Sequence, residues 1–346
     1  MDDILKDLNA EQRQAVTHVD GPLLIFAGAG SGKTRVIVHR VAHLIRQGVP
    51  ASQILCLTFT NKAALEMKER LERMLGHGYP GMWAGTFHAF GAWFLRHEAH
   101  RLGYPRSFVI YDSEDQRSLV NKCIRDLKLK ASKGADTTMA WLIAMAKDTL
   151  QDPKRIPCKL DFDPGPVIAL YEERKKAYGA FDFGDLLKVP GEMLTDMPEV
   201  KGRYQSLFRY ILVDEYQDTN MAQYVMLMGL VNPEQNICVV GDDDQSIYGW
   251  RGADVGNILR FKDDFPRAQK AQGLEARRRG YRHQGVPGRR ARGRLDRAYH
   301  PGPDGSGREP DGNRGFLPRQ CPLARDRGKF RSSGHPLCGL RRHALL

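Results

Sequence analysis

The sequence lacks the features of membrane-spanning and secreted proteins. No apolar run approaches the roughly 18 residues that a membrane-spanning helix needs. The segment from Met1 to Asp7 is acidic and carries no signal-peptide pattern. The six cysteines lie far apart and form no C-x-x-C pair, which argues against disulfides and zinc. We therefore expect a soluble, cytoplasmic protein with reduced thiols and no membrane partner.

Most of the chain also lacks an excess of positive charge. Residues 1–270 contain 35 basic and 35 acidic side chains, whereas residues 271–346 contain 18 basic and 6 acidic ones. The net charge of +12 therefore comes entirely from the last 76 residues. A basic chain often binds nucleic acid, but for residues 1–270 that inference must rest on particular side chains.

A glycine-rich segment follows the first buried-strand pattern, at residues 23–26. It is Ala27-Gly28-Ala29-Gly30-Ser31-Gly32-Lys33-Thr34, and a helical pattern begins at its end. The backbone N–H groups of such a loop bind phosphate oxygens, the lysine reaches the β- and γ-phosphates, and the threonine hydroxyl ligates Mg²⁺. Ala27 stands where a glycine is usual, and its small side chain should fit. A plain Gly/Ser turn is the alternative, which Lys33-Thr34 at this offset disfavours.

Two later strand patterns end in polar residues. The apolar run at 210–213 is followed by Asp214 and Glu215. In nucleotide hydrolases the first carboxylate holds Mg²⁺, directly or through water, and the second orients and deprotonates the attacking water. An acidic turn after a buried strand is the alternative. After the run at 237–240, Gln245 is placed to sense a γ-phosphate.

The order of patterns predicts an α/β fold. Strand patterns alternate with helical ones, which indicates a parallel sheet with helices on both faces. Between residues 105 and 205 long helical patterns dominate, at 114–128, 137–150 and 166–178, and predict a helical insertion. Residues 181–187 would then return towards the sheet. The expected parts are a first sheet segment at 1–104, the insertion at 105–205, a second sheet segment at 206–270 and a tail at 271–346.

Three polar or aromatic side chains are candidates for contacts with bases. Gln12 lies in a short helix that Asn9 should cap, and a glutamine amide can pair with N6 and N7 of adenine. Tyr248 and Trp250 lie two apart in an expected extended segment, so both can face the same way. Aromatic rings stack on bases without sequence preference. The alternative for the two aromatics is a place in the core.

Seven segments in order carry a resemblance to a known family. They are LNAEQRQAV, AGAGSGKTR, LTFTNKAA, GTFHAF, FDFGDLL, LVDEYQDTN and VGDDDQSIYGWRGA, between residue 8 and about residue 266. Together they resemble the superfamily-1 DNA helicases of the UvrD/Rep type. The resemblance implies an ATP-dependent 3′→5′ DNA helicase with a RecA-like P-loop motor domain and a helical insertion. It also implies single-stranded DNA and single-strand/duplex junctions as substrates, and repair or replication proteins as partners.

The resemblance also implies a role for individual residues. Lys33, Asp214, Glu215 and Gln245 would be the catalytic residues, and Thr34 and Asp214 would hold Mg²⁺. ATP would be bound by Gln12, the loop from Ala27 to Thr34, and Arg35. Single-stranded DNA would be bound by Thr58, Phe59, Asn61, His88, Tyr248 and Trp250.

The resemblance stops near residue 270. The family continues with L-E-Q-N-Y-R-S, whereas here Leu274-Glu275 is followed by Ala276-Arg277-Arg278. Residues 271–346 contain no Ile, Met, Thr or Trp, and only 11 of the 76 are Leu, Val or Phe, too few to bury a core. We expect this tail to be disordered. It is either a basic nucleic-acid-binding tail or the out-of-frame translation of a GC-rich gene, which the abrupt loss of the family pattern favours.

The loss of the family pattern near residue 270 has consequences for the expected activity. On this pattern the chain lacks the second motor domain, so we expect ATP binding through Lys33, weak ATPase activity and no strand unwinding. One alternative function is an ATP-dependent nuclease–helicase subunit, although residues 271–346 offer no cluster of nuclease-type acidic residues. Another is a non-catalytic fragment that binds ATP and single-stranded DNA.

Overall fold

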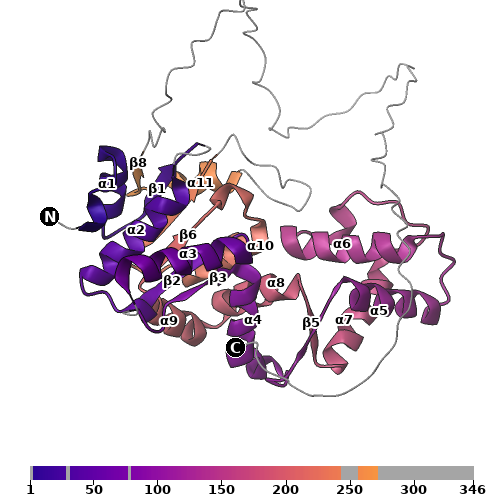
Figure 1. Cartoon of the computed structure of the whole chain (residues 1–346). Helices are drawn as coiled ribbons and strands as arrows, with labels where there is room; N and C mark the ends of the chain where they lie inside the picture. Colours follow the sequence, from indigo (N-terminus) through magenta and orange to yellow (C-terminus); the bar gives the residue numbers. More distant parts are fainter. Residues whose placement is uncertain (1–2, 29–31, 77–78, 243–255, 272–346) are drawn as a thin grey trace, which may run out of the picture. The chain divides into compact units, whose positions relative to one another are not determined.

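Six parallel strands form the main sheet of the computed structural model (Figure 1). The structure describes residues 3–28, 32–76, 79–242 and 256–271. The strands lie in the order β3-β2-β6-β7-β1-β8. Their bounds are β1 Leu23–Phe26, β2 Ile54–Thr58, β3 Trp83–Thr86, β6 Tyr210–Val213, β7 Ile237–Gly241 and β8 Gln269–Ala271. This order makes β1 and β6 the two neighbours of β7, so the segments that follow these three strands meet at one edge of the sheet.

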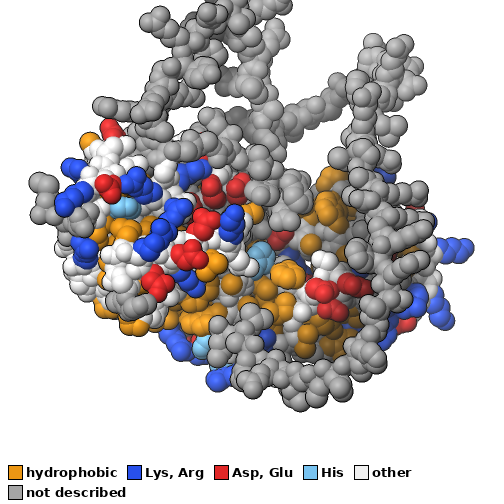
Figure 2. Space-filling view, in the orientation of Figure 1, with side chains coloured by type: hydrophobic (Ala, Val, Ile, Leu, Met, Phe, Trp, Pro, Cys, Tyr) orange, Lys and Arg blue, Asp and Glu red, His pale blue; other side chains and the backbone are white. Residues whose placement is uncertain are grey.

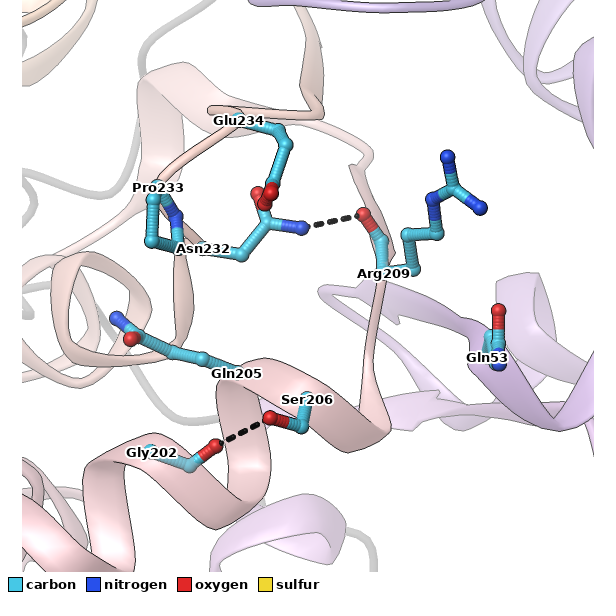
Figure 3. A pocket seen from close by; sticks show the side chains of 8 residues that line it. All are labelled: Gln53, Gly202, Gln205, Ser206, Arg209, Asn232, Pro233 and Glu234. Atoms are coloured by element: carbon cyan, nitrogen blue, oxygen red, sulfur yellow. Dashed lines mark hydrogen bonds between the residues drawn. The ribbon is translucent and has the colours of Figure 1, made fainter.

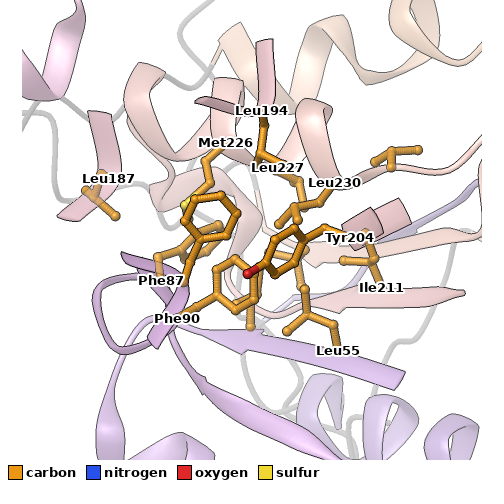
Figure 4. Close-up of a cluster of buried hydrophobic side chains, with 14 of the residues drawn as sticks. Leu55, Phe87, Phe90, Leu187, Leu194, Tyr204, Ile211, Met226, Leu227 and Leu230 are labelled. Carbon is orange, nitrogen blue, oxygen red and sulfur yellow. The ribbon is translucent and has the colours of Figure 1, made fainter. Parts of the chain in front are cut away.

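Both faces of this sheet are covered by helices, which explains why the strands are apolar throughout. Along β2, Leu55 and Leu57 belong to one hydrophobic core, and Ile54 and Cys56 belong to the other. The first core is completed by α4 Phe87–Glu98, α8 Asp185–Asp196, α9 Pro198–Leu207, α10 Met221–Leu230 and α11 Gly256–Asp264 (Figure 4). The second is completed by α1 Ala10–Thr17, α2 Lys33–Arg46 and α3 Asn61–Leu75. The expected α/β sheet with helices on both faces is confirmed.

The helices next to the strand ends begin at side-chain caps. Asn9 accepts a hydrogen bond from the Gln12 N–H and forms a capping box at the start of α1. Thr60 accepts from the Ala63 N–H before α3, and Thr86 accepts from the Ala89 N–H before α4. The caps fix where these helices start, and so they fix which side chains stand at the edge of the sheet.

A third hydrophobic core lies within the predicted insertion. It consists of side chains from α5 Ser113–Asp126, α6 Ala135–Thr149 and α7 Pro164–Ala177, in agreement with the three helical patterns. Two short strands, β4 Val109–Tyr111 and β5 Ala180–Asp182, pair in parallel with each other. Phe181 pairs with Ile110 in this separate ribbon, and Phe181, Leu186 and Leu187 also belong to the first core. Residues 181–187 therefore lead back towards the main sheet, as expected, although they do not add a strand to it. Next along the chain, α8 and α9 add side chains to the first core. The boundaries at 104, 205 and 270 stay predictions.

Short 3-10 turns join several of these elements. They are η1 Asp3–Leu5, η2 Ala51–Gln53, η3 Ala99–Leu102, η4 Pro153–Arg155 and η5 Tyr216–Asp218. Within the described residues, no helix is long and apolar enough to cross a membrane. The four cysteines that the structure describes, Cys56, Cys123, Cys158 and Cys238, are free thiols. The tail at 272–346, for which composition predicts disorder, lies outside the described residues.

Charge of both signs is mixed over the described surface that Figure 2 shows. In Figure 2 basic and acidic side chains alternate over the face that carries α2 and α3, with apolar side chains between them. This mixture agrees with the balance of 35 basic and 35 acidic residues in positions 1–270. The described surface in that view therefore offers no broad one-sign field for attracting a polyanion.

Candidate functional site

The predicted catalytic side chains follow three neighbouring strands. The loop after β1 leads into α2, and Asp214 and Glu215 come directly after β6. Between them lies β7, which ends at Gly241, the register partner of Phe26. In open α/β sheets, ligands bind at the carboxyl ends of the strands, where successive connections diverge. The sheet order therefore brings together residues that are about 180 positions apart in the sequence.

The start of α2 faces the carboxylates that follow β6. Lys33 Nζ lies 3.0 Å from Glu215 Oε2, and the Thr34 hydroxyl donates a hydrogen bond of 3.5 Å to Asp214 Oδ2. Gly32, just before α2, has a φ of 90°, which an L side chain rarely adopts. The two phosphate-loop side chains and the two acidic side chains thus form one cluster, as the sequence predicts.

Asp214 is buried, and its surroundings disfavour the charged form. Burial, and next the charge of Glu215, raise the pKa of Asp214 to about 6. The Glu215 N–H, which donates to Asp214 Oδ1 at 3.0 Å, works in the opposite direction but is outweighed. A divalent cation next to such a carboxylate stabilises the ionised form. The hydroxyl of Thr34 and the carboxylate of Asp214 are the oxygen ligands that Mg²⁺ prefers, so this pair fits the metal.

Glu215 is held in an unusual backbone conformation. Its φ of 51° lies in the left-handed region, which costs free energy for a residue with a side chain. Gln217, in η5, donates from Nε2 to Glu215 Oε2 at 2.8 Å and accepts at Oε1 from the Asp242 N–H at 3.1 Å. Gln217 is buried, so it links Glu215 rigidly to the end of β7. The sequence argument missed this residue, although it stands inside the LVDEYQDTN segment.

A further acidic side chain, Asp218, lies near the same cluster. It is buried, and burial followed by the charge of Glu215 raises the pKa of Asp218 to about 6. Its Oδ1 has no hydrogen-bond partner in the described part of the chain. The site therefore holds three carboxylates, of which Glu215 contacts the ammonium group of Lys33 and the other two interact with its charge. This arrangement favours the binding of further positive charge.

The remaining residues predicted to bind ATP differ in their burial and in their contacts. Gln12 is buried, and its Oε1 accepts from the Asn9 N–H at 3.1 Å, so its amide oxygen already serves the helix cap. Its Nε2 faces the loop, since a Cβ at Gly32 would lie 3.3 Å from that atom. Ala27 is buried, as expected of a small side chain that fits. Arg35 is 44% exposed and lies 3.9 Å from Asp7, at the periphery of the cluster.

The predicted DNA contacts follow β2 and β3, which are neighbours in the sheet. Asn61 is exposed at the start of α3, and Phe59 and His88 are half-buried. Thr58 differs from the expectation of a direct contact, because its side chain is fully buried and its hydroxyl donates to the Thr60 carbonyl at 3.0 Å. As placed, Thr58 supports the turn between β2 and α3.

Beside His88 lies an aromatic ring that the sequence argument did not single out. Phe183 is 50% exposed, and its ring centroid is 5.9 Å from that of His88 in an edge-on arrangement. Tyr178 and Trp141 are exposed to a similar degree, so it is the place of Phe183 beside His88, and not its exposure, that makes it a candidate for the same contacts. The signal in the sequence was the position of Phe183 within FDFGDLL, a segment that the family resemblance included without assigning it a role.

Residues 8–266 match a family described as the UvrD/REP helicase N-terminal domain. The chain belongs to this family. It is 42% identical over 274 residues to the protein named ATP-dependent DNA helicase PcrA of Staphylococcus epidermidis. It is 44% identical over 270 residues to the protein of that name from Bacillus subtilis. These alignments cover 78% and 77% of this chain but 38% and 36% of the relatives, so the chain spans little more than a third of their length.

Several residues with roles expected from the UvrD/REP resemblance lie outside the described residues. They are Ala29, Gly30, Ser31, Gln245, Tyr248 and Trp250. Their roles in phosphate binding, γ-phosphate sensing and base stacking stay predictions. Gly28 and Gly32, which flank the three loop residues in the sequence, are described.

A polar pocket of about 530 Å³ lies away from this cluster (Figure 3). Gln53 precedes β2, Arg209 precedes β6, and Asn232 lies before β7. The pocket is therefore at the amino ends of the strands, the edge opposite to Lys33 and Asp214. Two of its side-chain amides already form hydrogen bonds within the protein. Asn232 donates to the Arg209 carbonyl at 3.0 Å, and Gln205 donates to the Val231 carbonyl at 2.6 Å. We assign this pocket no part in the cluster around Lys33 and Asp214.

Proposed function

We propose that residues 8–266 form the first motor domain of an ATP-dependent 3′→5′ DNA helicase. The proposed substrates are single-stranded DNA and its junctions with duplex, in DNA repair or replication. The observation that carries the proposal is the meeting of Lys33 and Thr34 with Asp214 and Glu215 at one edge of the sheet. Nucleotide hydrolases need this combination, because positioning and charge stabilisation supply most of the catalysis of phosphoryl transfer.

ATP would bind with its phosphates at the start of α2. Lys33 would move from Glu215 to the β- and γ-phosphates, and the backbone N–H groups next to Gly32 would donate to phosphate oxygens. Thr34 and Asp214 would hold Mg²⁺, which would neutralise charge that develops on the phosphates during transfer. Gln12 Nε2, which faces the loop, would contact the base.

Once Lys33 has left, Glu215 becomes the base that accepts a proton from water. Gln217 keeps the Glu215 carboxylate in place through its 2.8 Å hydrogen bond, so the carboxylate does not have to be reoriented at each turnover. Gln245 remains the predicted sensor of the γ-phosphate. Because Lys33 would move from Glu215 to a phosphate when ATP binds, Glu215 would be able to act as a base only when nucleotide is bound.

Single-stranded DNA would pass over the ends of β2 and β3. Phe59, His88 and Phe183 offer rings for stacking, and Asn61 offers an amide for the backbone or bases. Stacking contributes roughly 1–3 kcal/mol per base. Tyr248 and Trp250 are proposed to extend the same path. Because residues 1–270 carry no net charge, ring stacking would supply a large share of the binding.

The whole activity of the relatives is itself a proposal for this chain, given the share of their length that it spans. For the 346-residue polypeptide on its own, we propose ATP and DNA binding with slow turnover and no unwinding. In motor ATPases a partner domain supplies arginines worth roughly 10³–10⁵ in rate. The proposed off-frame origin of residues 271–346 is tested by resequencing the gene, and an intact frame with the same tail in relatives would exclude it.

Single-turnover hydrolysis of ATP, with and without single-stranded DNA, tests the proposed function. We expect bound ATP to be hydrolysed slowly by the wild-type chain and not measurably by Glu215→Gln. Fast turnover stimulated by DNA would contradict the slow-turnover proposal while supporting the motor assignment. Failure to retain ATP at all would contradict the assignment itself, and retention without any hydrolysis would favour the non-catalytic alternative.

A further inference from the structure

Five charged side chains form a closed cluster where the insertion meets α8. They are Lys147 of α6, Glu172 and Lys175 of α7, Asp182 of β5 and Asp185 of α8, and we call them the lysine cage. Lys147 Nζ lies 2.6 Å from Asp182, 2.7 Å from Glu172 and 2.8 Å from Asp185. Lys175 Nζ lies 2.5 Å from Asp185, 2.6 Å from Glu172 and 3.3 Å from Asp182. Each ammonium group therefore contacts all three carboxylates.

The lysines and aspartates of the cage are almost entirely removed from water, whereas the Glu172 side chain is 41% exposed. Lys175 is 1% exposed, and Asp182 and Asp185 are 2% and 4% exposed. Burial lowers the pKa of Lys147, but the charges of Asp185, Asp182 and Glu172 outweigh burial and hold it well above its ordinary value. Buried charges are costly unless they are fully paired. Buried ion pairs can often be replaced by apolar residues without loss of stability. Stability alone therefore does not explain the cage, and we ask which part of the molecule it positions.

The three carboxylates also resemble a metal site, since their oxygens lie within 4.8 Å of one another. Here the two lysine ammonium groups contact all three carboxylates and offset two of their three formal charges. The Tyr171 hydroxyl adds a hydrogen bond of 2.8 Å to Asp182 Oδ2. Cations of the protein itself thus take the role that a metal ion would have, and we do not infer a metal here.

The same two aspartates fix the turn that carries Phe183. The Asp182 N–H donates to Asp185 Oδ2 at 2.9 Å, and the Asp185 N–H donates to Asp182 Oδ1 at 3.0 Å. Phe183 and Gly184 are the two residues between them. Lys147 packs against this turn, because a Cβ at Gly184 would lie 2.9 Å from its Cβ and Cδ atoms. The lysines therefore hold the turn both by charge and by contact.

The far side of the turn is fixed against α4, the helix that carries His88. A Cβ at Gly91 would lie only 1.7 Å from the Leu186 carbonyl oxygen, so the backbones of α4 and α8 are in direct contact. Phe183 is thereby held between the cage and α4. Its ring stands edge-on to that of His88, with half of its surface exposed.

We propose that Lys147 and Lys175 are positioning residues for DNA binding, which set Phe183 against His88 from the side of the helical insertion. The inference rests on the proposed function, in which these two rings stack on single-stranded DNA. It assigns the insertion a part in shaping the DNA path of the sheet domain. A cage that serves only to stabilise the fold would have no selective effect on Phe183.

The test compares Lys147→Met with Lys188→Met in the full chain. Lys188 also lies at the start of α8, but its ion pair of 2.8 Å with Glu192 is exposed to solvent.

For Lys147→Met we expect amide hydrogen exchange at residues 183–188 to rise roughly tenfold through local opening. The exchange of α2 and β6, and the affinity for ATP, should stay at wild-type values. Affinity for a single-stranded oligonucleotide, measured by fluorescence anisotropy, should fall roughly tenfold. Lys188→Met should change none of these.

A double-mutant cycle with Phe183→Ala separates positioning from general stability. If Lys147 acts through Phe183, the two losses of DNA affinity are not additive, and the double variant binds no more weakly than Phe183→Ala alone. Additive losses, or hydrogen exchange that rises evenly over the sheet, would overturn the proposal. Should Lys147→Met fail to fold, Tyr171→Phe removes one contact to Asp182 and is expected to show the same pattern at smaller size.

Failure of the proposed function would give a different result from failure of the positioning proposal. A wild-type chain that binds no single-stranded DNA would exclude the proposed DNA path, whatever the variants do. Hydrogen exchange at residues 183–188 would still decide whether the cage holds the turn. Unchanged exchange there in Lys147→Met and in Tyr171→Phe would overturn the positioning role on its own.

Discussion

Asp214 and Glu215 are adjacent in the sequence and have different surroundings. Asp214 is buried beside the Thr34 hydroxyl, whereas the Glu215 carboxylate is turned by a positive φ towards Lys33 and Gln217. One backbone conformation thus directs one carboxylate to the proposed metal position and the other to the proposed place of the base. The pattern of two acids after a strand predicts both residues, but it does not reveal the left-handed conformation that separates their roles.

Replacement of Glu215 by glutamine tests its role as the base. The variant keeps a similar shape and removes the ion pair between Lys33 and Glu215. We expect the rate of hydrolysis in a single turnover to fall by about 10²–10⁴-fold, while ATP binds as tightly as before or more tightly, since this ion pair no longer competes with the phosphates for Lys33. A variant with wild-type hydrolysis would contradict the assignment.

The pKa of Asp214 predicts a pH dependence of stability. In the unfolded chain the carboxyl has its ordinary pKa of 3.8, and folding raises the pKa to about 6. The folded chain therefore binds more protons between these values. The stability that the protonated group contributes is complete below about pH 4 and is lost as the pH rises through 6.

Asp214→Asn removes this dependence. Without Mg²⁺ at pH 7.5, we expect its free energy of unfolding in urea to exceed that of the wild type by about 2–3 kcal/mol. Near pH 3.5 the two proteins should differ little. A wild-type chain that is the more stable of the two at pH 7.5 would show that burial of Asp214 does not disfavour its charge.

At the scale of elements, close backbone contacts decide how α4 and α8 pack. Gly91 in α4 touches the Leu186 carbonyl, whereas Gly202 in α9 has no atom within 4 Å of its would-be Cβ. We expect Gly91→Ala to destabilise the fold by about 3 kcal/mol or more, because backbone must move. Gly202→Ala should stabilise it by about 0.5–1 kcal/mol through helix propensity. Urea unfolding of both variants checks the contrast, and equal effects would contradict the packing described.

Elements with a strong local pattern could be predicted from the sequence. The helix α2 begins at Lys33, where the helical pattern begins, and the apolar run at 210–213 is a buried strand, because hydrophobic periodicity is a local property. The pairing of β5 with β4 could not be predicted in this way. Its partner lies about 70 residues away, and nothing in FDFGDLL indicates which of two sheets receives it.

Side-chain contacts across elements were the least predictable part of the site. Gln217 has no distinguishing pattern of its own, and its role depends on the Asp242 N–H at the end of another strand. Thr58 was expected to face DNA, yet its hydroxyl bonds to the backbone of its own turn. Both cases depend on which neighbours the sheet order brings together, and the sequence alone does not specify those neighbours.

At the scale of the whole molecule, charge is divided sharply along the chain. Residues 1–270 are balanced, and the excess of +12 lies beyond them. A variant that ends after residue 275 keeps β8 and removes most of that excess. We expect it to match the full chain in thermal stability, ATP affinity and DNA affinity, since the proposed contacts all precede residue 271. A large loss of DNA affinity with a weaker salt dependence would favour the basic-tail explanation.

Equilibrium binding of a fluorescent ATP analogue, in the presence of Mg²⁺, decides most directly whether residues 8–266 form a nucleotide site. We expect saturable binding to the 346-residue chain that is weaker by roughly tenfold or more in Lys33→Ala, while affinity for single-stranded DNA stays unchanged in that variant. Equal affinity of the two proteins for the analogue, or no binding by either, would contradict the assignment of the first motor domain.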